Sequence, residues 1–238
     1  MVFEIKKRKR AGAEDGNVLF LILIAVALFA ALSYAVTSST RTGGGDASGE
    51  TLLIRSAQVT QYPAGISTAI VRMIIAGVSV DEIRFNRPAE YTDLDTNGLG
   101  VFHPSGGKAS YVAVPADMMF DGNAGQWIFN GELEVPEIGI ADTGGNDIIG
   151  FLVGLKQSIC MRINEEHGLG ATIPVLNADR STEYTTRMFD DGTTDYVLPT
   201  GDVPDIDDGS GMFDGQPFGC FRNAGGGDYV YYHVVLER

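Results

Sequence analysis

Two acidic runs hold the side chains best suited to chemistry, and each could bind a hard cation. The first run contains Asp93, Asp95 and Asn97 and is followed by a glycine. Oxygen side chains at alternate positions before a glycine are the opening spacing of a calcium-binding loop. The bidentate glutamate of such a loop is missing, because Pro104 stands at its twelfth position. This run predicts either a structural calcium site or an exposed, solvated loop.

The second acidic run lies about 110 residues further along the chain, and it consists of Asp202, Asp205, Asp207 and Asp208. Carboxylates this close together repel one another unless a cation or solvent screens them. Calcium binding and simple solvation are therefore the two interpretations here as well.

Two cysteines, Cys160 and Cys220, are the only ones in the chain. In a domain that faces an oxidising compartment, two cysteines most simply form one disulfide. The bond would close a loop of about 60 residues, for which chain entropy gives about 4 kcal/mol. The alternative is a pair of unpaired, buried thiols.

Signatures of catalysis are weak, and we expect no enzyme. The Gly-Gly-Lys sequence at 106–108 lacks the earlier glycine of a phosphate-binding loop. The three histidines, at positions 103, 167 and 233, show no metal-binding spacing.

The charge is divided unevenly along the chain. Residues 1–16 hold five basic and three acidic residues, for a net charge of +2, whereas the rest holds 12 basic and 28 acidic residues, for a net charge of −16. Nucleic acid is excluded as a partner, because its phosphates are bound by clustered basic side chains and the only basic cluster lies in this leader.

An apolar segment follows the leader and predicts a membrane span over 17–37. Its core, residues 18–36, contains one serine and one tyrosine among apolar residues. As a helix it is about 28 Å long, enough to cross the hydrocarbon core of a bilayer. The basic residues before it place the N-terminus in the cytoplasm and the rest of the chain outside the inner membrane. A cleaved secretory signal and a buried helix of a soluble protein are the alternatives.

The junction between leader and span is more specific. The leader ends in Gly16, and the apolar segment begins at Asn17. This arrangement resembles the prepilin leader of type IV pilins and of type II secretion pseudopilins over residues 6–40. The resemblance implies that a dedicated peptidase cuts after Gly16, and that membrane lipid, other pilin-like subunits or envelope proteins are the partners.

Three features depart from the pattern of that family. Leu21 stands where most pilins have a glutamate, and Asn17 stands where they have phenylalanine or methionine. The third departure is the glycine run at 43–45, which we expect to break the long helix that pilins use as a spine. Without the glutamate, the chain looks more like a tip or minor subunit than a repeating one.

A Gly- and Ser-rich linker over 38–49 leads to an exported α+β domain over 50–238. Apolar spacings of three and four predict helices from 52 to about 80, with a kink or a new helix at Pro63, and over 146–167, with a stop at Gly168. We expect strands at 110–114, 126–129, 132–135 and 228–236, the middle two joined by an Asn-Gly hairpin. The stretch 177–218 is predicted to be a surface excursion.

These patterns together predict a single-pass membrane protein with an α+β domain of antiparallel strands packed with one or two helices. The favoured function is that of a pilin-like or pseudopilin-like subunit that acts in assembly. The alternative is a permanently anchored binding module whose acidic surface binds calcium, a cationic ligand or a partner protein.

Overall fold

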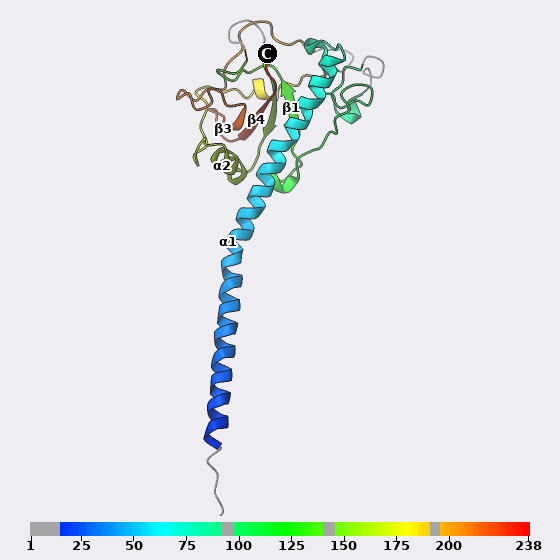
Figure 1. Ribbon diagram of the computed structural model, residues 1–238. Coiled ribbons are helices and arrows are strands. Elements are labelled where there is room, and N and C mark those ends of the chain that lie inside the picture. The colour runs from blue at the N-terminus through cyan, green and yellow to red at the C-terminus, as the bar shows by residue number, and fades with distance from the viewer. Residues whose placement is uncertain (1–14, 92–97, 140–145, 191–195) are drawn as a thin grey trace, which may run out of the picture. The chain divides into compact units, whose positions relative to one another are not determined.

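The computed structural model describes residues 15–91, 98–139, 146–190 and 196–238, and for residues 15–18 and 35–48 it describes the backbone alone. The chain divides into two compact units, residues 1–50 and residues 51–238. Helix α1, Asp15–Ile75, contributes residues to both (Figure 1).

The first unit contains the apolar part of α1. All side chains described from Leu19 to Tyr34 are exposed, with fractions between 58% and 77% at most of the large ones. In the part of the chain whose side chains are described, no helix is both long enough and apolar enough to cross a membrane. The expected break at glycines 43–45 is wrong, because α1 continues through them.

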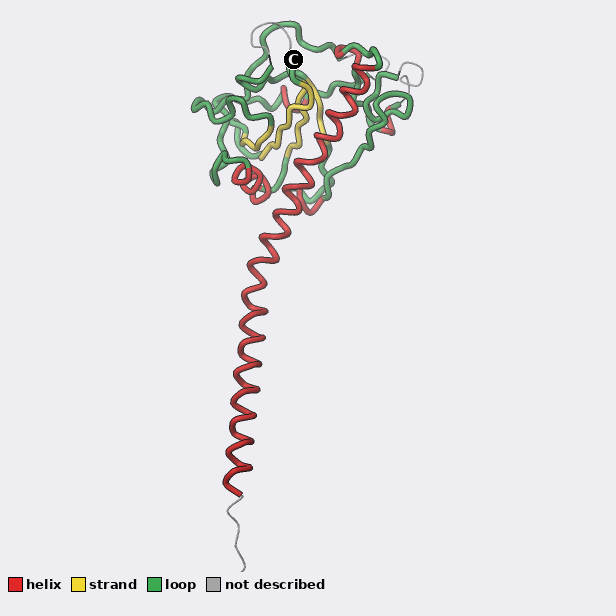
Figure 2. Tube along the Cα trace, in the orientation of Figure 1, coloured by secondary structure: helices red, strands yellow, loops and turns green. Residues whose placement is uncertain are grey.

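The second unit is built on a four-stranded antiparallel sheet (Figure 2). Its strands are β1, Trp127–Asn130; β2, Ile148–Val153; β3, Phe218–Arg222; and β4, Tyr229–Leu236, in the order β1-β2-β4-β3. The other helices are α2, Gln157–Glu166, and four single turns: η1, Val80–Glu82; η2, Pro88–Glu90; η3, Ala116–Met118; and η4, Glu183–Thr185. The α+β prediction for this domain is confirmed.

One face of the sheet packs against both helices. The helix α1 buries Val59, Ile66 and Ile70 there, and α2 buries Ile159 and Ile163. The strands contribute alternate side chains to this face, as a pleated sheet requires. The helical spacing predicted from residue 52 is confirmed as far as Ile75, and α1 runs through Pro63 without a new helix beginning there.

The opposite face is covered by long connecting segments. Tyr184, Ile206 and Phe213 are at most 2% exposed and pack against Phe221 and Tyr232 of the sheet. All three come from the stretch that was predicted to be a surface excursion. That prediction is therefore wrong for these residues, which close the second half of the core.

The helix predicted over 146–167 is wrong in its first half, which forms β2. The segment Ile-Ile-Gly-Phe-Leu-Val pairs with β1 and β4 and is buried on both sides of the sheet. An apolar run of this length fits a helix or a buried strand equally well by its periodicity. Its second half is confirmed as α2, and Gly168, at φ 79°, follows the end of that helix as expected.

The expected Asn-Gly hairpin is also wrong. Asn130 is fully buried, and its Nδ2 donates to the carbonyls of Glu183 (2.9 Å) and Thr186 (2.5 Å). Its Oδ1 also accepts from the Glu132 N–H at 3.0 Å, but β1 pairs with β2 and not with residues 132–135. Strands β1 and β4 confirm two of the four predicted strands, whereas 110–114 and 132–135 each form only a single bridge, at Val114 and Glu134.

Candidate functional site

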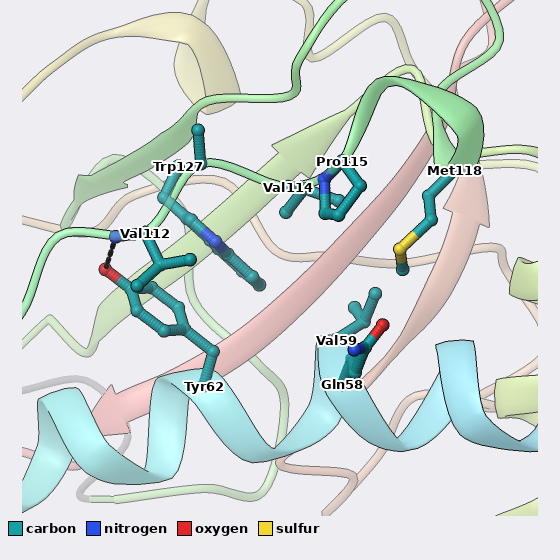
Figure 3. Close-up of a pocket in the computed structure, with 9 residues that line it drawn as sticks. Gln58, Val59, Tyr62, Val112, Val114, Pro115, Met118 and Trp127 are labelled. Carbon is teal, nitrogen blue, oxygen red and sulfur yellow. Dashed lines mark hydrogen bonds between the residues drawn. The ribbon is translucent and has the colours of Figure 1, made fainter.

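An apolar cavity of about 220 Å³ opens between α1 and the segment before β1 (Figure 3). Helix α1 supplies Gln58, Val59 and Tyr62 to its wall. The remaining lining residues are Val112, Ala113, Val114, Pro115, Met118 and Trp127. The cavity lies wholly within the second unit, so its walls belong to one compact body.

Tyr62 and Trp127 form the aromatic wall of this cavity. Their ring centroids are 5.2 Å apart in a stacked arrangement. The Tyr62 hydroxyl donates to the carbonyl of Ser110 (3.2 Å) and accepts from the backbone N–H of Val112 (3.3 Å), as the dashed line in Figure 3 marks. These bonds tie the segment before β1 to α1 and so hold the cavity open.

The chemistry of this cavity is that of binding. Burial raises the pKa of Tyr62 to about 12, so its hydroxyl stays protonated at neutral pH. The Gln58 amide is the other polar side chain of the wall. The lining therefore offers mainly apolar contact, because the Tyr62 hydroxyl is already hydrogen-bonded to the backbone of Ser110 and Val112.

The predicted disulfide between Cys160 and Cys220 is confirmed. It joins α2 to β3 with a Cα–Cα distance of 5.4 Å, and both residues are fully buried. Asn164, one turn further along α2, reinforces the same junction. Its Nδ2 donates to the Cys220 carbonyl, and its Oδ1 accepts from the Cys220 N–H, each at 2.9 Å.

The first acidic run, Asp93, Asp95 and Asn97, lies outside the described residues. In the second run, Asp207 accepts from the side chain of Asn177 and from the Gly209 N–H, at 2.6 and 2.7 Å. Asp208 accepts from the N–H and the hydroxyl of Ser210. These carboxylates are therefore already hydrogen-bonded to other groups of the chain.

Asp202 and Asp205 are exposed members of the second run. Burial is the largest of the effects that raise the pKa of Asp205, followed by the negative charge of neighbouring aspartates. In the described parts of the chain, no three Asp, Glu, His or Cys side chains converge on a point where a metal could bind. Calcium stays a prediction of the sequence.

The predicted processing residues, Gly16 and Asn17, lie at the start of α1, where the structure describes the backbone alone. The apolar cavity was missed by the sequence analysis. Tyr62 does lie on the predicted apolar face of its helix, but its stacking on Trp127, 65 residues away, has no signal in the sequence.

A second group of side chains lies at the edge of the sheet beside the disulfide, and its His233 falls in the strand predicted at 228–236. His233 of β4 stacks on Phe218 of β3 at 5.0 Å, and its Nδ1 is 2.8 Å from the Tyr231 hydroxyl. His167, at the end of α2, meets the edge of the same Phe218 ring at 4.3 Å. Burial, with a smaller contribution from His167, lowers the pKa of His233 to about 4.

Replacing His233 with phenylalanine should make the protein less sensitive to acid. Unfolded His233 binds a proton below about pH 6.5, whereas native His233 does so only near pH 4, so the unfolded state binds more protons between these values. Wild-type stability should therefore fall by about 2–3 kcal/mol relative to the variant as the pH falls from 6.5 to 4. Urea unfolding of both proteins across this range measures the difference, and parallel pH profiles would contradict it.

A second buried group, Asp147, also changes its protonation in this pH range, so the wild type must be compared with the His233 variant. It is 1% exposed, its Oδ1 accepts from the Arg238 N–H (3.0 Å), and burial raises its pKa to about 6. The native state therefore keeps this proton up to about pH 6, and the contribution of Asp147 to stability decreases as the pH rises to that value. This trend opposes that of His233, but it is common to both proteins and cancels in their difference.

Comparison of the chain with protein-family models, curated proteins and solved structures finds no match. The function must therefore be argued from the residues themselves.

Proposed function

We propose that the chain is a pilin-like or pseudopilin-like subunit, anchored in the inner membrane by its apolar helix and acting in assembly at the cell envelope. The observation that carries the proposal is the apolar stretch of α1. From Leu19 to Tyr34 every described side chain is exposed, and the large ones are leucine, isoleucine, valine, phenylalanine and tyrosine. A helix surface of this kind is stable in lipid or against other apolar helices, but not in water.

The charges on either side of the apolar stretch support an orientation. The basic residues at 6–10 precede it, and the folded domain that follows is strongly acidic. Basic residues near a span remain on the cytoplasmic side, so the second unit is placed outside the membrane. The buried disulfide between Cys160 and Cys220 agrees with this placement, because disulfides persist in oxidising compartments.

Two features support the pilin-like character in particular. The leader ends in Gly16 directly before the apolar stretch, as in the prepilins that it resembles. Helix α1 also continues through glycines 43–45 to Ile75 and packs its last turns on an antiparallel sheet. One of the three departures from the family pattern is thereby removed, and those at Asn17 and Leu21 stay.

Processing after Gly16 is the direct test. The mature protein from the native host should begin at Asn17, and Gly16→Val should abolish cleavage, because a peptidase that requires glycine before the cut does not accept a branched side chain. N-terminal sequencing of the purified protein measures both. Gly12→Val, at the other glycine of the leader, is the matched control and should be cleaved normally.

A native protein that begins at Met1 would overturn the proposal, and one that begins at Val36 would indicate a cleaved secretory signal instead.

The second candidate function is a permanently anchored binding module. The apolar cavity beside Trp127 favours it, because such a cavity suits a ligand or a side chain of a partner. An intact Met1 on a membrane-bound protein would support this candidate.

A further inference from the structure

A second cavity, of about 340 Å³, lies beside the last turns of α1 and differs in character from the first. Two basic side chains line it, Arg72 of α1 and Lys108 of the loop that packs on it. The other lining residues are Met73, Ala76, Val78, Gly98, Ser105, Gly106 and Gly107. None of these described lining residues is acidic.

Both the backbone and the guanidinium group of Arg72 are held in position at the wall of this cavity. Its neighbour Met73 is 3% exposed and anchors the helix in the core, and Arg72 Nη2 donates to the Gly107 carbonyl at 3.0 Å. A guanidinium group carries five N–H donors, so this bond leaves donors to spare. The side chain can therefore bind an anion without leaving its position.

Lys108 is positioned by a closely packed loop. A Cβ at Gly106 would lie 2.1 Å from the Gly100 carbonyl oxygen, and one at Gly107 would lie 2.5 Å from the Val101 carbonyl oxygen. Only glycine fits such an approach of two backbone segments. The following Lys108 adopts φ 56°, and its N–H donates to the His103 carbonyl at 3.2 Å. The loop thus fixes the backbone from which the lysine extends.

Arg72 and Lys108 belong to the basic residues of this unit that form no ion pair with a carboxylate within the described residues. Four arginines form ion pairs within the described residues: Arg55, Arg162, Arg180 and Arg187. Neither Arg72 nor Lys108 forms an ion pair in those same residues, although the chain has a net charge of −14. Two cations that share one cavity repel each other until an anion binds between them.

No residue of the second acidic run, Asp202 to Asp208, lines this cavity. The loop of this run is anchored by Ile206 and Phe213, which pack on the face of the sheet opposite the helices. Met73 and Val101, beside the basic cavity, pack on the helix-covered face. Ile206 and the basic cavity therefore lie on opposite faces of the sheet, whereas Leu198, four residues before Asp202, packs on the helix-covered face. Asp202 and Asp205 are exposed and so are accessible to a partner.

We propose that the cavity of Arg72 and Lys108 binds the acidic run of a second copy of this chain, through Asp202 and Asp205. The inference deepens the proposed function, since it names a contact between assembled subunits. The two surfaces consist of different residues, so each bound copy presents a free acidic run to the next. A contact of this type propagates into a filament unless rotation closes it into a ring.

Cross-linking with a carbodiimide tests this contact directly, because the reagent joins an amine to a carboxylate that it already touches. The full-length protein in detergent, mixed from ¹⁵N-labelled and unlabelled copies, should yield a peptide that joins Lys108 to Asp202 or Asp205 with one label in each half. The yield should fall at least threefold in 0.5 M salt, since exposed ion pairs are screened there. Absence of the mixed peptide would overturn the proposal.

Charge exchange is the second arm of the experiment. Arg72→Glu with Lys108→Glu should reduce association in sedimentation at least tenfold, and so should Asp202→Lys with Asp205→Lys. A mixture of the two variants should associate again, because each supplies the charge that the other lacks. Arg222→Glu, at an exposed arginine of β3, is the matched control and should associate as wild type does.

Failure of this contact is distinguishable from failure of the proposed function. A mature N-terminus at Asn17 without recovery of association in the mixture would contradict the proposed contact but not the pilin-like function. Recovery in the mixture with an intact Met1 would support the contact and reject the pilin-like processing. Circular dichroism spectra equal to that of the wild type show that the variants are folded.

Discussion

Removing the disulfide should lower the free energy of unfolding of the sheet domain by about 4 kcal/mol. Cys160 and Cys220 are separated by 60 residues, so the bond excludes many conformations of the unfolded chain. Cys160→Ala with Cys220→Ala is the appropriate variant, since alanine leaves no polar group in this buried site. Thermal unfolding should show a melting temperature about 10 °C lower for a chain of this size.

The control for this experiment is chemical reduction. Wild-type protein with a reducing agent should fall to the melting temperature of the double variant, and the same agent should leave the double variant unchanged. A double variant that melts with the oxidised wild type would show that the bond contributes nothing. The hydrogen bonds from Asn164 to the Cys220 backbone survive both treatments, so these results isolate the covalent bond.

Truncating Trp127 to alanine should cost about 3–5 kcal/mol, the range for large aromatic residues in a core. Trp127 is 2% exposed and contacts three rings, those of Tyr62, Phe129 and Tyr231, at centroid distances of 5.2–6.3 Å. Its loss would leave a void between α1 and the sheet. Urea unfolding monitored by circular dichroism measures the change.

Val112→Ala is the matched control for Trp127, because both residues line the apolar cavity. Val112 is 53% exposed, so its truncation should change stability by less than about 0.5 kcal/mol. Equal effects of the two substitutions would mean that the cavity wall is not part of the core. The expected contrast would show that Trp127 is part of the core, whereas Val112 at the exposed side of the cavity contributes little to stability.

Both predictions concern junctions on the helix-covered face of the sheet. The disulfide joins α2 to β3 on the face where α1 packs, and Trp127 fills the interface between α1 and β1. Loss of either is therefore expected to loosen the helix on its sheet as well as to destabilise the domain.

Local patterns predicted the elements whose signals are strong. The helical spacing that includes Val59, Ile66 and Met73 is nearly uninterrupted and identified the packed part of α1. The β-branched and aromatic run at 228–236 identified β4. In both segments the period of the apolar residues agrees with the final structure, so local preference and packing do not conflict.

Where local signals were ambiguous, packing against distant residues decided the outcome. Residues 148–153 form a strand because they pair with β1 on one side and with β4 on the other. Asn130 favours a turn locally and its Oδ1 accepts from the Glu132 N–H, but its Nδ2 donates to the carbonyls of Glu183 and Thr186, more than 50 residues away. No spacing within either segment carries information about such partners.

The sequence by itself determined the uneven charge, the apolar segment after a glycine-terminated leader, the α+β class and the cysteine pair. These properties depend on residue type and near neighbours, which can be read directly from the chain. Only the tertiary structure decided that Met73, beside the basic cavity, packs on the helix-covered face of the sheet, whereas Ile206 of the acidic run packs on the opposite face. The physical reason is that a sheet separates residues by face according to strand pairing, and pairing joins residues too distant in sequence for any local pattern to relate them.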